Sequence, residues 1–264
     1  MTTGNDGRDT TVERIEAAFD DVVAYMAAAD EGENSSPDEP VKRYQATRER
    51  ILASPEVAVP FLADQFDADG FVRKESAYDL LVRLAEDPDV RETIEGLIDG
   101  KEPLPQLWLI SVLHFHGDSE FASRFEELLS HSDPYVRHLA ALATVFQGFV
   151  ARTDSDELMD ALVSALSSDR SIEGSIFYVA DSALSCITLV TGERFTDTQE
   201  MPVDFYNFDH LVSEPPVHPF PYTTDRVVDL TESKRRSLVT RVGEWWEANR
   251  GTATLTPTTG AFER

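Results

Sequence analysis

The chain has 264 residues, of which 41 % are hydrophobic and 9 % aromatic, enough to bury a sizeable core. Its 49 acidic residues outnumber the 23 basic ones and give a formal net charge of −26, so we expect no nucleic-acid or anionic-membrane partner. The single cysteine, Cys186, excludes an intramolecular disulfide, and the chain has no apolar run of the ~20 residues that a membrane span needs. The N-terminus has neither the basic start nor the apolar core of a signal peptide, so we expect a cytoplasmic protein.

The basic residues are four lysines and 19 arginines. Few lysines among many acids is typical of proteins from salt-accumulating archaea, where high salt screens the repulsion between like charges. A GC-rich bacterium, whose codons favour arginine, would give the same bias. The composition therefore leaves two sources open.

The N-terminal part of the chain reads as a helical extension over residues 11–54. We expect residues 1–10 to be disordered. A Thr three residues before a Glu, followed by apolar residues spaced three and four apart, predicts a helix over 11–29. Residues 30–39 are acidic and contain no apolar side chain, which predicts an exposed linker.

Residues 55–191 form a series of helical patterns without strand alternation. The breaks between them are short, so successive helices should be antiparallel neighbours. The expected helices span residues 56–66, 70–85, 88–98, 104–116, 119–130, 134–147, 155–168 and 174–191.

An internal repeat runs through this region. The segment from Asp69 to Ala77 matches the segment from Asp133 to Ala141 in its Asp, its aromatic residue, its Val-Arg pair and its small residues. Weaker copies begin near Leu104 and at Ile176. The repeat unit is therefore predicted to be a helix pair of roughly 30–39 residues, present about four times.

The segment Asp-Pro-Tyr-Val-Arg-His-Leu-Ala-Ala, which begins at Asp133, resembles the second-helix signature of HEAT repeats. It is most similar to the prokaryotic HEAT-like branch that includes phycobilisome-lyase-type proteins. The resemblance covers about half of the chain. It implies an all-α fold, a short right-handed α-solenoid of about four HEAT-like helix pairs, with second helices lining the concave face. N-terminal helices and a C-terminal cap would complete the fold.

The resemblance also assigns roles to the motif residues. Its Asp and Arg side chains would bond along the stack from repeat to repeat, and its valines would be core. These structural positions are Asp69, Val72, Arg73, Asp133, Val136 and Arg137.

The repeat alignment also predicts a surface for a partner. On each second helix the positions outside the core frame recur four residues apart, so they form one stripe along that helix. Side by side, the stripes would make a mixed aromatic and polar patch, although Ile110, Leu142 and Phe146 could equally be core. The candidate partner-binding residues are Lys74, Tyr78, Gln106, Ile110, His114, His138, Leu142, Phe146, Phe177 and Asp181.

The C-terminal part begins with residues 192–231, which hold five prolines and lack helical period. A helix over 232–250 with Trp245 and Trp246 would cap the last repeat, and residues 251–264 would be a flexible tail. The aromatic residues of the long loop could cap the solenoid or could recognise a partner.

No catalytic or metal-binding motif is present in the sequence. HEAT-like deoxyhypusine hydroxylases bind iron through His-Glu pairs, and this chain has no such pair. We expect Cys186, on a mostly apolar helix, to be a buried inert thiol. The favoured interpretation is a monomeric, non-catalytic scaffold or adaptor without metal or cofactor that binds another protein on its concave face, where an acidic surface suits a basic partner. The alternative, by resemblance only, is a lyase-type or accessory factor acting on a small chromophore or a modified protein.

Overall fold

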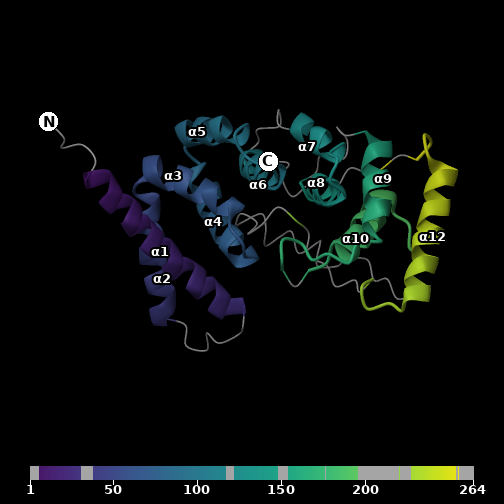
Figure 1. Cartoon of the computed structure of the whole chain (residues 1–264), viewed down its shortest axis with the longest axis horizontal. Coiled ribbons are helices and arrows are strands. Elements are labelled where there is room, and N and C mark those ends of the chain that lie inside the picture. The colour runs from purple at the N-terminus through teal and green to yellow at the C-terminus, as the bar shows by residue number, and fades with distance from the viewer. Residues whose placement is uncertain are drawn as a thin grey trace. The chain divides into compact units, whose positions relative to one another are not determined.

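A computed structural model shows a helical protein (Figure 1). The structure describes residues 6–30, 38–116, 122–147, 154–175, 177–195, 220, 227–253 and 255. Within these residues every regular element is a helix, and the only β-type pairing is an isolated bridge between Ser171 and Tyr178. This confirms the all-α prediction. None of the helices in the described ranges is both long and apolar enough to cross a membrane.

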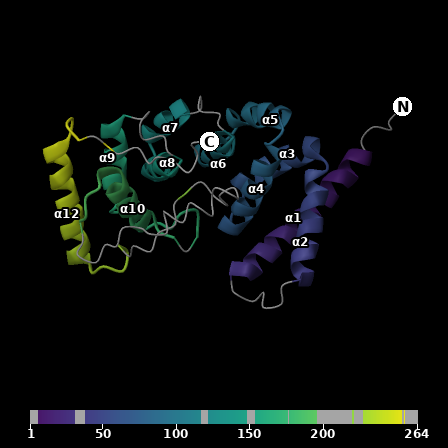
Figure 2. The same cartoon turned by 180° about the vertical axis from the view of Figure 1, so that it is seen from behind.

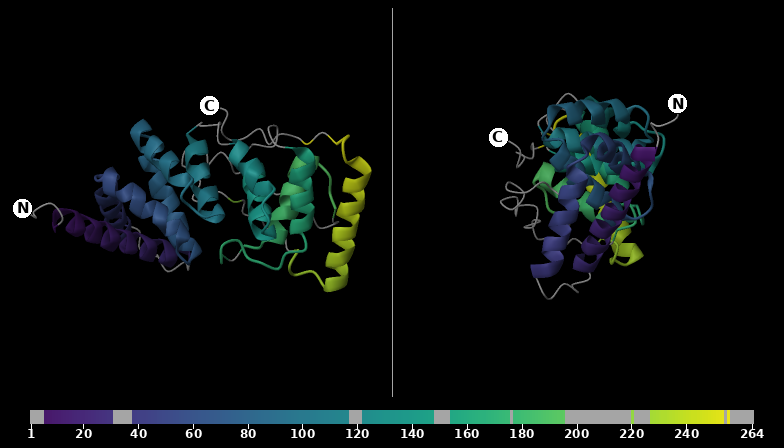
Figure 3. Two further views of the ribbon diagram at one scale, coloured as in Figure 1. Left: turned by 45° about the horizontal axis from the view of Figure 1, so that its top comes forward. Right: turned by 90° about the vertical axis from the view of Figure 1, so that its left-hand side faces the viewer.

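The chain divides into two compact units, Met1–His116 and Gly117–Arg264. In the first unit the two N-terminal helices lie side by side, and both also contact α4 (Figure 3). The helices of this unit are α1 (Asp6–Asp30), α2 (Asp38–Leu52), α3 (Pro55–Asp64), a 3₁₀ turn (Gln65–Asp67), α4 (Phe71–Leu84), α5 (Pro88–Ile98) and α6 (Pro103–Phe115).

In the second unit, α9 lies between α10 and the C-terminal helix (Figure 2). The helices of this unit are α7 (Ala122–Leu129), α8 (Pro134–Phe146), α9 (Ser155–Ala165), α10 (Val179–Thr191) and α12 (Glu232–Asn249).

Two kinds of helix alternate along both units. The even-numbered helices α4, α6, α8 and α10 are buried on nearly all sides over most of their length. The odd-numbered helices bury one stripe: α5 buries only Val90, Ile94 and Ile98, which follow each other at intervals of four residues. Helices α4, α6, α8 and α10 therefore form the core of their units, and helices such as α5, α9 and α12 form the outer layer.

The helix boundaries differ from the predicted ones at several places. The predicted linker over residues 30–39 is shorter than expected, because α1 ends at Asp30 and α2 already begins at Asp38. Residues 1–10 are not disordered throughout, because α1 already begins at Asp6. The expected helix over 174–191 begins only at Val179, because the residues before it form a tight hairpin. In this hairpin Glu173 and Gly174 both have positive φ, at 50° and 79°, as the two central residues of a type I′ turn require.

The hairpin is held by the N-terminal end of α8. The Tyr135 hydroxyl donates to the Ser171 carbonyl (2.9 Å) and accepts from the Glu173 backbone N–H (2.7 Å). The Arg170 guanidinium lies 3.4 Å from the centre of the Tyr135 ring. Burial raises the pKa of Tyr135 to about 12, so the hydroxyl remains a donor at neutral pH.

The end of α10 follows the prediction, since Gly192 closes the helix in a left-handed conformation with φ of 72°. Most of the predicted acidic linker (30–39), of the Pro-rich loop (192–231) and of the tail (251–264) lies outside the described residues.

Candidate recognition surfaces

The predicted partner-binding stripe is mostly core. Tyr78, Ile110 and Leu142 are fully buried, and Phe146 is 9 % exposed. The stripe therefore does not form the open patch that the repeat alignment suggested. Phe177 also leaves the stripe, because it precedes α10 rather than lying on that helix with Asp181. Gln106 and His114 are the remaining members with partial exposure.

The polar members of the stripe make contacts inside their own units. His138 Nε2 lies 2.9 Å from the Ser164 hydroxyl, and Gln106 donates to the Lys101 carbonyl (2.8 Å). Asp181, which is 2 % exposed, accepts from the Val228 backbone N–H (3.0 Å). Lys74 is buried as well. Lys74, His138 and Asp181 therefore stabilise the units from within, which corrects their assignment to an exposed surface, whereas Gln106 keeps partial exposure.

His138 and Ser164 are the residue types that serve as general base and nucleophile in some enzymes. Burial, with a smaller effect of the nearby Arg137, lowers the pKa of His138 to about 4. An imidazole of so low a pKa is a weak base at neutral pH. The pair is therefore suited to joining α8 and α9, and it is poorly suited to activating the hydroxyl.

The Asp-Pro-x-Val-Arg motif starts α8 in a defined way. Asp133 caps the helix by accepting from the Tyr135 N–H (2.8 Å), and Pro134 takes the first helical position. Arg137 folds back onto the carbonyls of His131 (2.6 Å) and Ser132 (3.0 Å) at the preceding turn. Arg137 therefore hydrogen-bonds the turn that precedes its own helix. The resemblance had implied a bond from one repeat to the next.

The same arrangement occurs at the start of α5, in the other unit. Asp87 caps the helix through the Asp89 N–H (2.9 Å), and Pro88 is again the first helical residue. Arg91 donates to the carbonyls of Ala85 (2.7 Å) and Glu86 (3.3 Å), at the same sequence distances as Arg137. The valines of both motifs are buried. A search for the five-residue pattern alone would have found this second copy.

Asp69 and Arg73, the predicted equivalents, behave differently. The N-cap of α4 is Gly70, with φ of 102°, and Asp69 is exposed. Arg73 donates to the side chains of Gln65 (2.7 Å) and Asp20 (2.9 Å), and so joins α4 to α1. Val72 is half-buried rather than core. The structural counterpart of Asp133 is thus Asp87.

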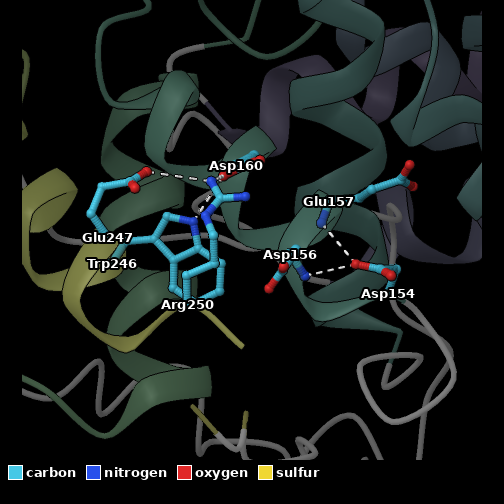
Figure 4. A network of polar contacts seen from close by, with 7 residues as sticks. All are labelled: Asp154, Asp156, Glu157, Asp160, Trp246, Glu247 and Arg250. Atoms are coloured by element: carbon cyan, nitrogen blue, oxygen red, sulfur yellow. Dashed lines mark hydrogen bonds and ion pairs between the residues drawn. The ribbon is translucent and has the colours of Figure 1, made fainter. Parts of the chain in front are cut away.

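The helix α12 is fixed to α9 at its C-terminal end by the network in Figure 4. Trp246 is 2 % exposed, and its Nε1 donates to Asp160 Oδ1 (2.8 Å). Arg250 pairs with the same carboxylate and stacks over the Trp246 ring, 5.3 Å from its centre. Trp245 is only half-buried and meets Phe195 edge to face (5.7 Å). Asp160, which the sequence did not single out, is therefore the centre of this contact.

The N-terminal end of α12 is fixed to α9 as well. Arg235 donates to the Leu166 carbonyl (3.1 Å) and the Ser168 carbonyl at the end of α9, and it pairs with Asp169. Beside these contacts lies a shallow pocket of about 330 Å³. It is lined by Ser167, Asp169, Glu232, Arg235, Arg236, Val239 and Thr240.

The solvent side of α5 carries only acidic charge. Glu92 and Glu95 are exposed there, and Asp89 and Asp99 are exposed on the same helix or just after it. Arg91 is committed to the carbonyls before the helix, as described above. The other nearby cation, Lys101, pairs with the side chains of Asp64 (2.7 Å) and Asp67 (2.6 Å).

The remaining groups with reactive side chains are the clustered acids and the single cysteine. Among the described residues, no group of three or more His, Cys, Asp or Glu side chains is placed to hold a metal ion. The four acids at the start of α9 include Asp154, which caps that helix through the N–H groups of Asp156 (2.8 Å) and Glu157 (3.1 Å) (Figure 4). Cys186 is fully buried, and burial raises the pKa of its thiol. Asp154 is thus committed to the start of α9, and the Cys186 thiol is shielded from solvent.

Similarity to known proteins does not identify this chain. No family model matches it, and no curated protein or solved structure does so either.

Proposed function

We propose that the chain is a non-catalytic scaffold built of HEAT-like helix pairs, and that it binds another protein through its outer helices. The observation that supports this most is the repeated helix start. Asp87–Arg91 and Asp133–Arg137 lie in different units, yet their contacts are equivalent. In both, the Asp caps the helix, the Pro is the first helical residue, and the Arg donates to the carbonyl six residues earlier. The two copies begin helices of different kinds, the outer α5 and the inner α8, so they repeat a way of starting a helix. Together with the alternation of inner and outer helices they support an array of helix pairs with an extended binding surface.

The partner surface in this proposal is the outer layer rather than the stripe on the even helices. Side chains that are fully buried cannot meet a partner without unfolding the unit that holds them. The solvent face of α5 is accessible, and its acidic side chains suit a partner rich in Lys and Arg. Complementary charge of this kind mainly sets the rate and the specificity of association.

The experiment compares two variants of equal charge change. One carries Glu92→Lys and Glu95→Lys on α5, and the matched control carries Glu13→Lys and Glu16→Lys on the exposed side of α1. Each is used to capture partners from cells at native salt, with cross-linking and mass spectrometry.

We expect the same protein partner with the wild type and the α1 control, and its loss with the α5 variant. Equal capture by both variants would remove α5 as the docking face. Repeated failure of the wild type to retain any protein would count against a scaffold. A coloured small molecule retained through purification would instead favour a lyase-type activity.

A further inference from the structure

The helix α12 is attached to its unit along one side. Among the described helices it packs mainly on α9, and the side chains that it buries are Leu238, Val242 and Trp246. Arg235 binds the C-terminal end of α9, whereas Arg250 binds the middle of that helix, so the two helices run antiparallel. Most other side chains of α12 are exposed. The helix therefore covers α9 without being covered itself.

The seam between α9 and α12 is not closely packed along its whole length. The pocket of about 330 Å³ opens where the end of α9 meets the first half of α12. Protein interiors have few gaps larger than a water molecule, so a cavity of this size removes contacts that would hold the helices together. The polar bonds to α9 lie at the two ends of the seam, at Asp160 and at the carbonyls of Leu166 and Ser168. Between these ends α12 is held by its three apolar side chains.

The sequence of α12 also makes it a weak helix. Within the described residues its N-cap, Thr231, makes no side-chain capping bond, and Gly243 stands in the helix interior. After Pro, Gly is the least favourable residue there, and packing does not require it, because a Cβ would meet no described atom within 4 Å. The β-branched residues Val239, Thr240 and Val242 lower the helix propensity further. Because helices in proteins owe most of their stability to packing, α12 depends on α9.

The segment just before α12 ties it to the unit independently of α9. Val227 is buried, and the Val228 backbone N–H donates to the buried carboxylate of Asp181 on α10 (3.0 Å). The residues between this anchor and Glu232 form a turn rather than a helix. The helix α12 can therefore leave α9 while the chain remains fixed at Asp181.

We propose that α12 is a displaceable cap. It leaves α9 as one unit while α8, α9 and α10 stay folded, and it opens α9 to an amphipathic helix of a partner protein. The contacts of α12 define what the site accepts: apolar residues four apart, and an arginine near each end, roughly 22 Å apart along the helix. This site does not involve α5, so the proposal stands independently of the acidic face.

Hydrogen exchange of the full chain, followed by mass spectrometry, tests the opening. We expect the amides of α12 to exchange together, at least 10-fold faster than the core amides of α8 and α10, because one opening exposes the whole helix. Asp160→Ala should accelerate the exchange of α12 further, since it removes the acceptor of Trp246 and Arg250. Glu157→Ala, which makes the same charge change on α9, is the matched control and should not. Exchange of α12 at the rate of α8 and α10 in the wild type would overturn the proposal.

A fluorescein-labelled peptide of residues 230–252 tests whether α9 accepts a helix from another chain, with binding followed by fluorescence anisotropy. Trp246→Ala weakens the cap of the chain and leaves α9 unchanged, so this variant should bind the peptide at least 10-fold more tightly than the wild type. Leu238→Ala, which weakens the cap at another turn, should do the same and guards against a folding failure of one variant. Arg241→Ala, at an exposed residue of α12, is the control and should bind like the wild type.

Adding Asp160→Ala to either cap variant should abolish the gain in peptide binding, because the site on α9 then lacks its carboxylate. Protection of the α8 and α10 amides shows that each variant keeps its core. Peptide binding that is equal in the cap variants and the Arg241→Ala control, or that is absent from all of them, would overturn the proposal.

Discussion

The two adjacent tryptophans of α12 should differ sharply in their contribution to stability. Trp246 is 2 % exposed and donates a hydrogen bond to Asp160, whereas Trp245 is half-buried and touches Phe195 by its edge. The sequence alone treats them as equals. Replacing each with Ala therefore tests whether the contact between α9 and α12 is as the structure shows.

The magnitude follows from burial and hydrogen bonding. A buried Trp replaced by Ala costs about 3–5 kcal/mol, since a cavity remains. Trp246→Phe keeps most of the apolar area but removes the donor to Asp160, which costs about 1–3 kcal/mol for a bond to a charged group. Arg250 continues to pair with Asp160 in that variant, so the lower end of this range is expected. Trp245→Ala should cost about 1–2 kcal/mol, because less area is buried.

Differential scanning calorimetry of the full chain measures these effects directly. At about 2–4 °C per kcal/mol for domains of 150–250 residues, Trp246→Ala should lower the melting temperature of the second unit by about 6–20 °C. Trp245→Ala should lower it by a fraction of that. Equal shifts for the two Ala variants, or no shift for Trp246→Phe relative to the wild type, would refute the contact described for Asp160.

Two further predictions concern pH and salt. The lowered pKa of His138 means that its contribution is fully present above pH ~6.5 and is lost as the pH falls toward 4, since the unfolded chain takes up the proton first. Between pH 7 and 4.5 the free energy of unfolding of the wild type should therefore fall by about 2–3 kcal/mol more than that of His138→Gln, measured by urea denaturation; parallel curves would contradict this. The net charge of −26 predicts that the melting temperature rises as KCl increases from about 0.05 to 2 M, because the Debye length falls to ~3 Å near 1 M. An unchanged melting temperature would favour codon bias as the cause of the missing lysines.

Periodicity was sufficient to predict most of the helices, because helical spacing and short loops are local properties. It failed at residues 174–178, where an apolar run is compatible with a helix. The turn at Glu173 and Gly174 depends on Tyr135, nearly 40 residues earlier, and such a contact leaves no local signal.

The sequence predicted the repeat motif correctly at Asp133 and paired it with the wrong segment at Asp69. The alignment paired Asp69 with Asp133 because an aromatic residue follows both at the same distance, but capping depends on the Asp being adjacent to the first helical residue. That condition is met at Asp87 and Asp133 and not at Asp69, where Gly70 intervenes. Local chemistry at the helix start was a better guide than overall similarity.

The stripe of candidate site residues failed for a different reason. Positions four apart on a helix share a face, but the sequence does not say whether that face meets solvent. On α4 and α8, polar residues such as Lys74 and His138 sit among apolar neighbours and are buried with them, because other helices of the same unit cover both sides. A chain that buries its inner helices in this way leaves its outer helices for the recognition proposed above. There, exposed side chains can vary in charge without disturbing the core, and this is where α5 and α12 differ most. α5 carries only acids on its solvent face, whereas α12 carries both cations and acids on its own, although each buries an equally narrow apolar stripe. Packing does not account for this difference, and the charge variants of α5 and α1 test whether a partner accounts for the acids on α5.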